Sequence, residues 1–521
     1  MPVESRRRGR ETRTVRLAVA VAMAVLAAAL AVFTGPLLAA GSAEKKRHAD
    51  RGTTTPKPDY ELEKSIPDRL DVFDLNLRQT RRFSATKNFR IVGHSYLRGP
   101  WLTDAARRAG LGAGFNTPRV YDGIGYFAGY DNPIGTVFGV VIADVRDPRD
   151  IRPLSFVPCN PGTRCPYIRV NNDEKILVFG NDSNPRNPDR PPEGEPVRAG
   201  VSFWDVSDPR NPEELSFVET RPNGATHGFT IDDRYMYGCA SAPESKTGVT
   251  GANQELQIID YSDPENARLV GRLHIPGQHV GEDFAPQDRL NPDGTEQKVW
   301  CHEIDVMGDR LYIAWRDAGM VVVDVSDRTD PKVISRLDYV PPFNGGSLGA
   351  AHSSMPIMPH EEGGEPSLLI NTDEIFDCPP GFGRVMDISD LSNPQIISSF
   401  RIPAINDNYD HETGEFVCPE GQQSIHMPWF DHRAPGLAYV TWYDQGVRVW
   451  DFSNPFIPKE VGYFISPQYA VPGVPPDRHT RETYQDPETD LIWVTDGNGG
   501  GVTVLRWTGD LPEHPPIPGA R

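Results

Sequence analysis

The sequence predicts an all-β fold, a seven-bladed β-propeller closed by a strand from the N-terminal side of the chain. A strand followed by an Asp-x-Ser-Asp-Pro turn recurs along the 521 residues, and 50 prolines and 48 glycines punctuate short apolar runs. Six histidines also stand before apolar strands at similar places in the repeat. Many short strands joined by turns, repeated every few tens of residues, are typical of propeller blades.

The repeat is clearest at the end of its main strand, where an aspartate precedes the turn. Successive aspartates are separated by 61, 55, 64, 63 and 64 residues, and they are Asp144, Asp205, Asp260, Asp324, Asp387 and Asp451. A seventh, degenerate copy is Val502–Arg506, 55 residues after the sixth. Asp and Ser side chains cap their own backbone in such turns, which gives these residues a structural role.

One blade can be followed strand by strand. Its four strands are predicted at residues 302–307, 311–316, 320–325 and 332–339. Gly308-Asp309 forms the two-residue turn after the first strand. The apolar runs are nearly continuous, which indicates strands packed on both faces by neighbouring blades.

The ends of the chain predict how the ring closes. The seventh blade ends at Trp507 after its third strand, and residues 88–93 look like the missing fourth strand. A ring closed in this way has no exposed sheet edge. We therefore expect a signal or anchor at 1–43, an exported linker at 44–87, the propeller at 88–508 and a tail at 509–521.

The first residues predict export. Six arginines precede the apolar segment 17–33, and Ala39–Ser42 supplies small residues for cleavage. The segment suits the core of a signal peptide or a short membrane-anchor helix. The flanking arginines keep the N-terminus in the cytoplasm. The remainder is expected in the periplasm, at the cell surface or in the medium, with an N-terminal membrane anchor as one alternative.

The charge balance argues against one class of partner. The net charge is −19, and no block of Lys and Arg interleaved with aromatic residues follows the N-terminal segment. Because nucleic-acid binding needs clustered cations to neutralise phosphates, we expect no nucleic-acid partner.

Six cysteines fit an oxidising compartment. Cys159 and Cys165 suit a small disulfide-closed loop, and Cys378 and Cys418 lie in Pro-rich segments where they could pair. The remaining two, Cys239 and Cys301, either form a disulfide between blades or supply thiolates to copper. Sequence alone does not fix the connectivity.

The histidines are the strongest functional signal. Six are predicted at the start of a blade's first strand, and the second blade has Cys165-Pro166-Tyr167 there instead. The six are His94, His227, His302, His352, His426 and His479. First strands line the channel of a propeller, so these imidazoles are expected to converge on its axis. A single histidine is usually structural, but six in phase favour a metal site of one to three ions, with copper preferred and zinc or iron as alternatives.

Acidic residues are expected beside the histidines. Glu303 follows His302, so strand alternation points it to the opposite face, together with Asp305. Glu374 ends a second strand, and Asp317, Asp444 and Asp496 do the same in other blades. Turn capping is the alternative role for each of these. Glu303 and Glu374 are the candidate proton acceptors for catalysis.

The strands Leu256–Asp260 and Val321–Asp324 resemble those of the bacterial LVIVD-repeat proteins, which are exported propellers. This resemblance covers about residues 89–507 and indicates architecture rather than chemistry. The first strands that carry histidine also resemble those of the selenium-binding proteins, the methanethiol oxidase family, in which hub histidines hold copper. Copper propellers such as thiocyanate dehydrogenase and nitrous oxide reductase share this plan. The resemblance implies the six histidines as ligands, but no cysteine motif matches the thiol-oxidising family.

Three functions follow as hypotheses. The first is an exported copper-dependent oxidoreductase that acts on a small molecule in the central channel. The second is a non-catalytic surface propeller that binds a protein or a glycan through polar loops such as 241–254 and 403–423. The third is a hydrolase or lactonase that uses zinc or calcium in the same channel. The sequence favours the first and does not identify the substrate or the electron acceptor.

Overall fold

The computed structural model describes only part of the chain. The described residues are 77–515, apart from 103, 105–106, 108–111, 131–135, 249–250, 253, 292–293, 339–348, 360–363, 403–408, 411, 417–421 and 468–478. The predicted signal segment, Cys418 and much of the 403–423 loop therefore lie outside the described residues. Within the described part, no helix combines the length and hydropathy that a membrane span requires.

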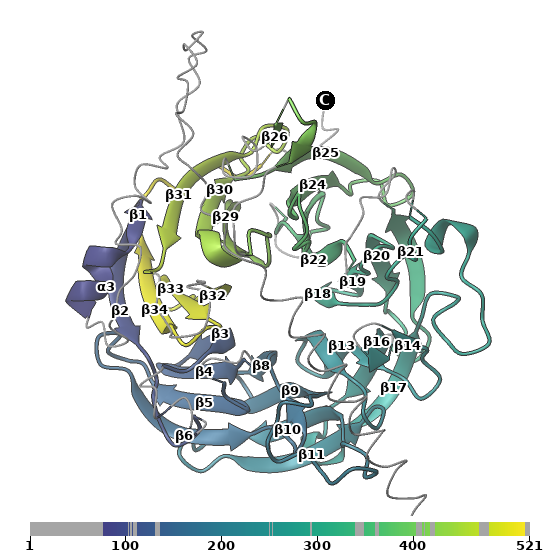
Figure 1. Cartoon of the computed structure of the whole chain (residues 1–521), viewed down its shortest axis with the longest axis horizontal. Coiled ribbons are helices and arrows are strands. Elements are labelled where there is room, and N and C mark those ends of the chain that lie inside the picture. Colours follow the sequence, from purple (N-terminus) through teal and green to yellow (C-terminus); the bar gives the residue numbers. More distant parts are fainter. Residues whose placement is uncertain are drawn as a thin grey trace, which may run out of the picture. The chain divides into compact units, whose positions relative to one another are not determined.

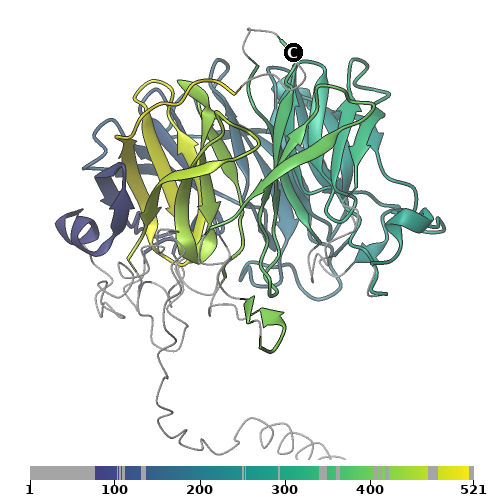
Figure 2. The same ribbon diagram turned by 90° about the horizontal axis from the view of Figure 1, so that it is seen from above.

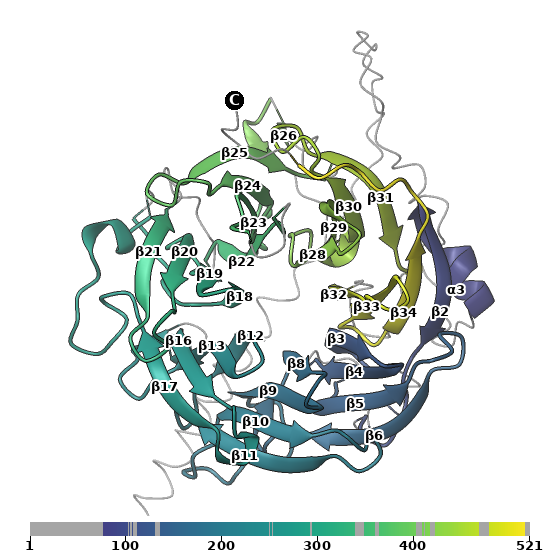
Figure 3. The same cartoon turned by 180° about the vertical axis from the view of Figure 1, so that it is seen from behind.

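The described residues form seven antiparallel sheets arranged as the blades of a β-propeller (Figures 1 and 3). The first strands, nearest the axis, are β3 (Phe115–Tyr121), β8 (Ile168–Asn171), β12 (Thr226–Ile231), β18 (Glu303–Met307), β22 (Ala351–Pro356), β28 (Pro428–Asp431) and β32 (Thr480–Gln485). The second strands are β4 (Ile124–Gly129), β9 (Ile176–Ser183), β13 (Tyr235–Ser241), β19 (Arg310–Ala314), β23 (Leu368–Asp373), β29 (Ala434–Trp442) and β33 (Leu491–Asp496).

The outer half of each blade carries the repeat. The third strands are β5 (Gly139–Asp144), β10 (Gly200–Asp205), β16 (Gln254–Asp260), β20 (Met320–Asp324), β24 (Gly383–Asp387), β30 (Gly446–Asp451) and β34 (Gly501–Trp507). The fourth strands are β6 (Arg152–Pro158), β11 (Glu213–Glu219), β17 (Arg268–Leu273), β21 (Lys332–Leu337), β25 (Gln395–Phe400), β31 (Lys459–Ile465) and β2 (Phe89–Ser95). Seven blades and the strands of the 302–339 blade are thus confirmed.

The structure also contains short elements beyond the four main strands of each blade. They are helix α3 (Leu77–Phe83), strand β7 (Thr163–Arg164), the pairs β14 (Thr247–Gly248) with β15 (Gly251–Ala252) and β26 (Tyr409–Asp410) with β27 (Glu415–Phe416), and the 3-10 turns Pro264–Asn266, Pro286–Asp288 and Tyr443–Gln445. The blades stand side by side around the axis when the ring is seen from its edge (Figure 2).

The ring closes as the sequence predicts. β2 pairs with β34, so the N-terminal strand completes the seventh blade, with Phe89 opposite Trp507. A further strand, β1 (Ala85–Lys87), pairs with β31 and adds a fifth strand to the sixth blade. The sequence did not predict β1, and the sheet structure begins at Ala85 rather than at residue 88.

The hydrophobic core lies between adjacent blades. Side chains from neighbouring sheets pack together, as where Phe127 of the first blade meets Trp493 of the seventh with ring centroids 6.1 Å apart. Strands buried on both faces need apolar residues on both faces, which explains the continuous apolar runs. The repeated turn is capped as predicted: Asp205 Oδ1 accepts a hydrogen bond from the Ser207 backbone N–H at 2.8 Å.

Candidate metal centre

The first strands share an irregularity at the end where they enter the channel. In β3, β12, β22 and β32 the pairing with the second strand shifts near the strand's start. Such β-bulges re-aim a side chain away from the sheet. Asn116, His227, His352 and Arg481 occupy these bulges. His302 directly precedes β18, and His426 lies two residues before β28. The backbone N–H groups of both still bond to the second strands.

Four of the predicted histidines come together as a row of imidazoles. The ring centroids are 5.1 Å apart for His227 and His302, 4.3 Å for His302 and His352, and 4.3 Å for His352 and His426. Tyr443 extends the row, 4.9 Å from His426. The structure thus brings four of the six predicted histidines next to one another.

His479 joins the row from a different position. Its ring lies 4.8 Å from that of Tyr443, and Arg481 Nη1 lies 3.2 Å from its Nε2. Because the bulge of β32 follows Thr480, the residue equivalent to the other histidines is Arg481. The seventh blade thus places a guanidinium where the third to sixth blades place an imidazole.

The predicted position of His94 is wrong. His94 lies on β2, the fourth and outermost strand of the seventh blade, and not on a first strand. Its Nδ1 lies 3.0 Å from Thr503 Oγ1, and its ring meets that of Tyr96 edge-on at 4.7 Å. β2 comes before the first blade in the sequence but completes the seventh blade as its outermost strand. His94, which lies on β2, is therefore not at the hub. Asn116 occupies the hub position of the first blade.

The four clustered histidines share one hydrogen-bonding arrangement. His302 Nδ1 lies 3.2 Å from the His352 carbonyl oxygen, and His426 Nδ1 lies 2.7 Å from the Arg481 carbonyl oxygen. His227 Nδ1 lies 2.5 Å from Asp182 Oδ2. Carbonyl and carboxylate oxygens only accept, so Nδ1 donates in each case, which leaves the lone pair on Nε2.

His352 reaches the same tautomer through a hydroxyl. Its Nδ1 lies 2.7 Å from Ser353 Oγ, which donates its single proton to Met427 Sδ at 2.7 Å. Ser353 therefore accepts from His352, and Nε2 of His352 again carries the lone pair. Within the described residues, Nε2 of the buried His426 has no hydrogen-bond partner.

Burial keeps these imidazoles neutral. His302, His352 and His426 are almost fully buried, as is His479. Burial is the main reason that the pKa of each lies well below the ordinary histidine value, and nearby arginine charges lower it further. Neutral imidazole is the protonation state that binds transition metals.

Glu374 is the carboxylate of this cluster. Its oxygens lie 3.7 Å from His352 Nε2 and 4.0 Å from His426 Nε2. The Tyr443 hydroxyl donates to Glu374 Oε1, and Arg316 Nη2 donates to Oε2 at 3.0 Å. One ligand atom each from His302, His352 and Glu374 lie within 4.8 Å of one another. This group has the donors and the spacing to hold one metal ion.

A cavity of about 430 Å³ opens over the cluster, and we call it the hub cavity. His227, His302, His352, His479 and Glu374 line it together with Gln254, Trp300, Phe376, Arg316 and Arg481. Within the described part of the chain, Nε and Nη1 of the buried Arg316 have no hydrogen-bond partner. The cavity therefore offers guanidinium donors beside the imidazoles.

Glu303 faces a different cavity. As predicted, it lies on the opposite side of its strand from His302 and shares that side with Asp305, and both line a second cavity of about 360 Å³. Burial raises the pKa of Glu303 to about 8 and that of Asp305 to about 6. Glu303 thus keeps its proton at neutral pH and lies outside the histidine cluster.

The other acidic residues at the ends of second strands cap backbone groups. Asp317 accepts from the N–H of Lys298 at 2.7 Å and of Ala350 at 2.9 Å. Asp444 accepts from the Gln422 N–H at 2.6 Å, and Asp496 from the Asn498 N–H at 2.8 Å. The capping alternative holds for these three, whereas Glu374 faces the histidines.

Two disulfides confirm predicted pairings. Cys159 bonds to Cys165, and Cys239 bonds to Cys301. The second pair ties β13 of the third blade to the segment that ends in His302, so its sulfurs are not free thiolates. The predicted partner of Cys378, Cys418, lies outside the described residues.

One family model matches part of the chain. The model of the LVIVD repeat family matches residues 301–338, the blade followed above. No curated protein matches the chain in sequence. The fold is similar to the computationally designed Ika8 protein at 12% identity over 76% of this chain and 96% of that chain, with a TM-score of 0.38.

Two solved structures of natural proteins are also similar. The β-propeller domain of Cps50 (Swd1) from Myceliophteria thermophila is 10% identical over 76% of this chain and 98% of its own, with a TM-score of 0.44. Raptor from Chaetomium thermophilum is 12% identical over 78% of this chain and 29% of its own, with a TM-score of 0.45. Seven blades are present in the sheets of the chain itself, and one of these blades matches the LVIVD repeat model.

Proposed function

We propose that the protein is an exported copper-binding oxidoreductase that acts on a small molecule in the hub cavity. One observation carries the proposal: His227, His302, His352 and His426 each engage Nδ1 with a protein acceptor, so that each Nε2 bears the lone pair. A hydrogen-bond acceptor at the other ring nitrogen is the usual companion of a metal-bound histidine. Side-chain packing alone does not explain why four adjacent blades repeat this hydrogen bond from Nδ1.

The donor set fits copper. His302, His352 and His426 would hold the ion through Nε2, with Glu374 as an oxygen donor or a neighbouring base. Imidazole suits copper, zinc and iron alike. Among divalent first-row metals, the affinity of a given site generally rises from manganese to copper. His227 is close enough to His302 to serve the same ion or a second one. Bound copper would supply a one-electron couple and an open coordination position.

The surrounding residues would orient the substrate and move its proton. Arg316 and Arg481 line the hub cavity and suit an oxygen acceptor on the substrate, such as a carboxylate or a carbonyl group. Glu374 lies beside the imidazoles and accepts from the Tyr443 hydroxyl, so a substrate proton would pass to this pair. Since Glu303 is already protonated at neutral pH, we assign the acceptor role to Glu374.

The first test is the metal content of the full chain, produced with added copper and purified without a histidine tag. We expect stoichiometric copper in the natural sequence and its loss in His302→Gln/His352→Gln. His432→Gln is the matched control, because His432 pairs with a single carboxylate, Asp490, at 3.1 Å. Copper retained by the hub variant at the level of the control would overturn the proposal.

The same preparation separates the alternatives. A copper absorption band that bleaches with a reducing substrate supports the oxidoreductase. A hub that takes zinc, shows no redox change and hydrolyses esters or lactones identifies the metal-dependent hydrolase. If the folded protein binds no copper, zinc or iron, the result supports the non-catalytic propeller that binds a protein or a glycan.

A further inference from the structure

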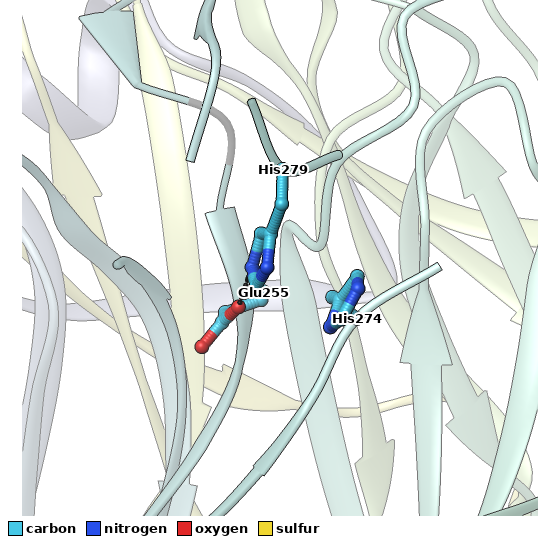
Figure 4. A group of neighbouring side chains, drawn as sticks. All are labelled: Glu255, His274 and His279. Atoms are coloured by element: carbon cyan, nitrogen blue, oxygen red, sulfur yellow. Dashed lines mark hydrogen bonds and ion pairs between the residues drawn. The ribbon is translucent and has the colours of Figure 1, made fainter. Parts of the chain in front are cut away.

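A second group of metal-binding side chains lies at the edge of the third blade, outside the hub. Glu255 is near the start of β16, and His274 directly follows β17. β16 pairs with β17 so that Leu256 lies opposite Leu273, which puts Glu255 and His274 across from each other. His279 enters from the loop that follows. Figure 4 shows the His279 ring directed toward the Glu255 carboxylate, with His274 beside them.

The three side chains are in close contact. His279 Nε2 lies 2.6 Å from Glu255 Oε2, and the two imidazoles stack with centroids 3.7 Å apart and planes 17° from parallel. One ligand atom from each of the three lies within 4.8 Å of the others. Glu255 is only 1% exposed, so its carboxylate is directed into the protein and toward the imidazoles. A buried carboxylate beside two imidazoles is the donor set of many zinc sites.

Glu282 supports the arrangement from the loop. Its Oε1 lies 3.1 Å from His274 Nε2, and its Oε2 accepts from the backbone N–H of Gly277 at 2.9 Å. These backbone and imidazole hydrogen bonds hold the pKa of Glu282 at about 2. In metal sites, a carboxylate commonly accepts a hydrogen bond from a ligating histidine and so holds its ring in place.

The local charge suits a cation. The carboxylates of Glu244, Glu255 and Glu282 surround the group, whereas the nearby cations are Arg272 and Lys246. Arg272 donates to Glu255 Oε1 at 2.5 Å and to Glu244 Oε2 at 2.8 Å, and the Lys246 Nζ donates to the Glu282 carbonyl oxygen at 2.5 Å. Three negative and two positive charges leave an excess of one negative charge when both imidazoles are neutral. A divalent ion would meet favourable charge here.

We infer that Glu255, His274 and His279 form a second metal site, which takes zinc and fastens the 274–282 loop to the start of β16. Two imidazoles and one carboxylate suit a borderline divalent ion better than calcium or magnesium, which prefer oxygen ligands alone. The inference does not depend on copper at the hub, because the two sites share no residue.

The position of the loop gives the site its effect. Gln278 Nε2 donates to the Gln254 carbonyl oxygen at 2.8 Å, and Cys301 N–H donates to the same oxygen at 3.0 Å. Gln254 and Trp300 line the hub cavity. Fastening the loop would therefore hold one wall of the hub cavity in place.

The test is zinc binding by the full chain, by calorimetry and by metal content after dialysis. We expect His279→Gln to lose one zinc equivalent, with binding at this site weakened by about 100-fold, on the order of other lost metal-site partners. His302→Gln/His352→Gln should keep this equivalent, and His432→Gln is the surface control. Equal zinc content in His279→Gln and His432→Gln would overturn the inference, as would loss of all zinc in the hub variant.

A second measurement tests the fastening. Hydrogen exchange of the amides of Gly277 and Gln278 should slow when zinc is added to the natural sequence and stay unchanged in His279→Gln. Because the comparison is made with and without zinc on each folded protein, a general loss of stability in the variant does not mimic the result. Zinc that binds without slowing these amides would contradict a role in fastening the loop.

Discussion

Ser155, on the fourth strand of the first blade, donates a hydrogen bond of 2.6 Å to the carbonyl oxygen of Pro209 in the turn of the second blade. The same contact recurs between later blades, from Ser216 to Pro264 and from Ser398 to Pro455, each at 2.6 Å. Each serine lies where the pairing of its strand with the third strand shifts. The repeated Asp-Pro turn thus joins one blade to the next as well as reversing the chain.

This contact predicts a difference between two equivalent serines. Ser155→Ala should lower the free energy of unfolding by about 1 kcal/mol, since it removes one hydrogen bond to a neighbouring blade. Ser335 holds the same position in the fourth blade, opposite Val322, but its buried hydroxyl has no partner among the described residues. Ser335→Ala should therefore change stability little. Equal losses in urea unfolding would show that the contact between blades is not the cause.

The hydrogen bond between Ser353 and His352 is expected to affect the copper affinity of the hub. Ser353→Ala removes the acceptor for His352 Nδ1, so the ring loses its fixed tautomer and orientation. We expect copper affinity to fall about 10- to 100-fold while the fold remains, the usual effect of losing such a partner. The neighbouring Ser354 instead donates to Asn371 Oδ1 at 2.7 Å, so Ser354→Ala is the matched control. Competition titration with a copper chelator measures both, and similar affinities would contradict the prediction.

The disulfide between Cys239 and Cys301 separates a structural role from a ligand role. Its ends are 62 residues apart in the sequence. Removing a cross-link that closes a loop of this length costs about 4 kcal/mol of unfolding free energy in the chain-entropy treatment. Cys239→Ala/Cys301→Ala should thus unfold at lower denaturant concentration but retain copper at a concentration where it is folded. Loss of copper from the folded variant would revive the thiolate alternative.

His94 predicts a pH effect outside the hub. Burial lowers its pKa to about 4, whereas an unfolded chain binds the proton below about 6.5. Between these values the unfolded state holds more protons, so the free energy of unfolding falls as the pH drops through this range. His94→Gln lacks this loss and should gain up to about 3 kcal/mol relative to the natural sequence between pH 7 and pH 4.

Urea unfolding at a series of pH values gives the comparison, and the copper content of His94→Gln is measured beside it. Copper should be unchanged, since His94 lies on an outermost strand. A constant stability difference across the pH range would show that His94 is not neutral in the folded state. A lower copper content in the folded variant would indicate that His94 is a copper ligand after all.

The fold was predictable because its signals are local and repeated. Six strands that end in Asp before the repeated turn mark third strands, and the degenerate copy Val502–Arg506 brings the count to seven blades. Residues 88–93 were identifiable as the closing strand because the last blade lacks its own. β1 was not identifiable, because a strand of three residues has no recognisable sequence pattern. It forms only because β31 offers an unpaired edge on the sixth blade.

The site was predictable in part. His227, His302, His352 and His426 follow from their place in the repeat, but His94 failed because it lies on the closing strand itself. Arg481 was missed because the sequence does not show where the bulge of β32 falls. Asp182 lies near the end of a second strand, as Glu374 does, and that similar position was the signal that would have found it. Tyr443 and Arg316 reach the cluster only through contacts between blades, which no local pattern records.

The closing strand also sets the order in which the protein can finish folding. Phe89 pairs with Trp507, 418 positions later in the chain. β2 therefore cannot pair with β34 until the more than 400 residues between them have been synthesised. Contacts between such distant residues slow folding, and a waiting strand is open to pairing with other chains. Completion of the seventh blade is thus expected to be the last and slowest step, and the one most dependent on protein concentration.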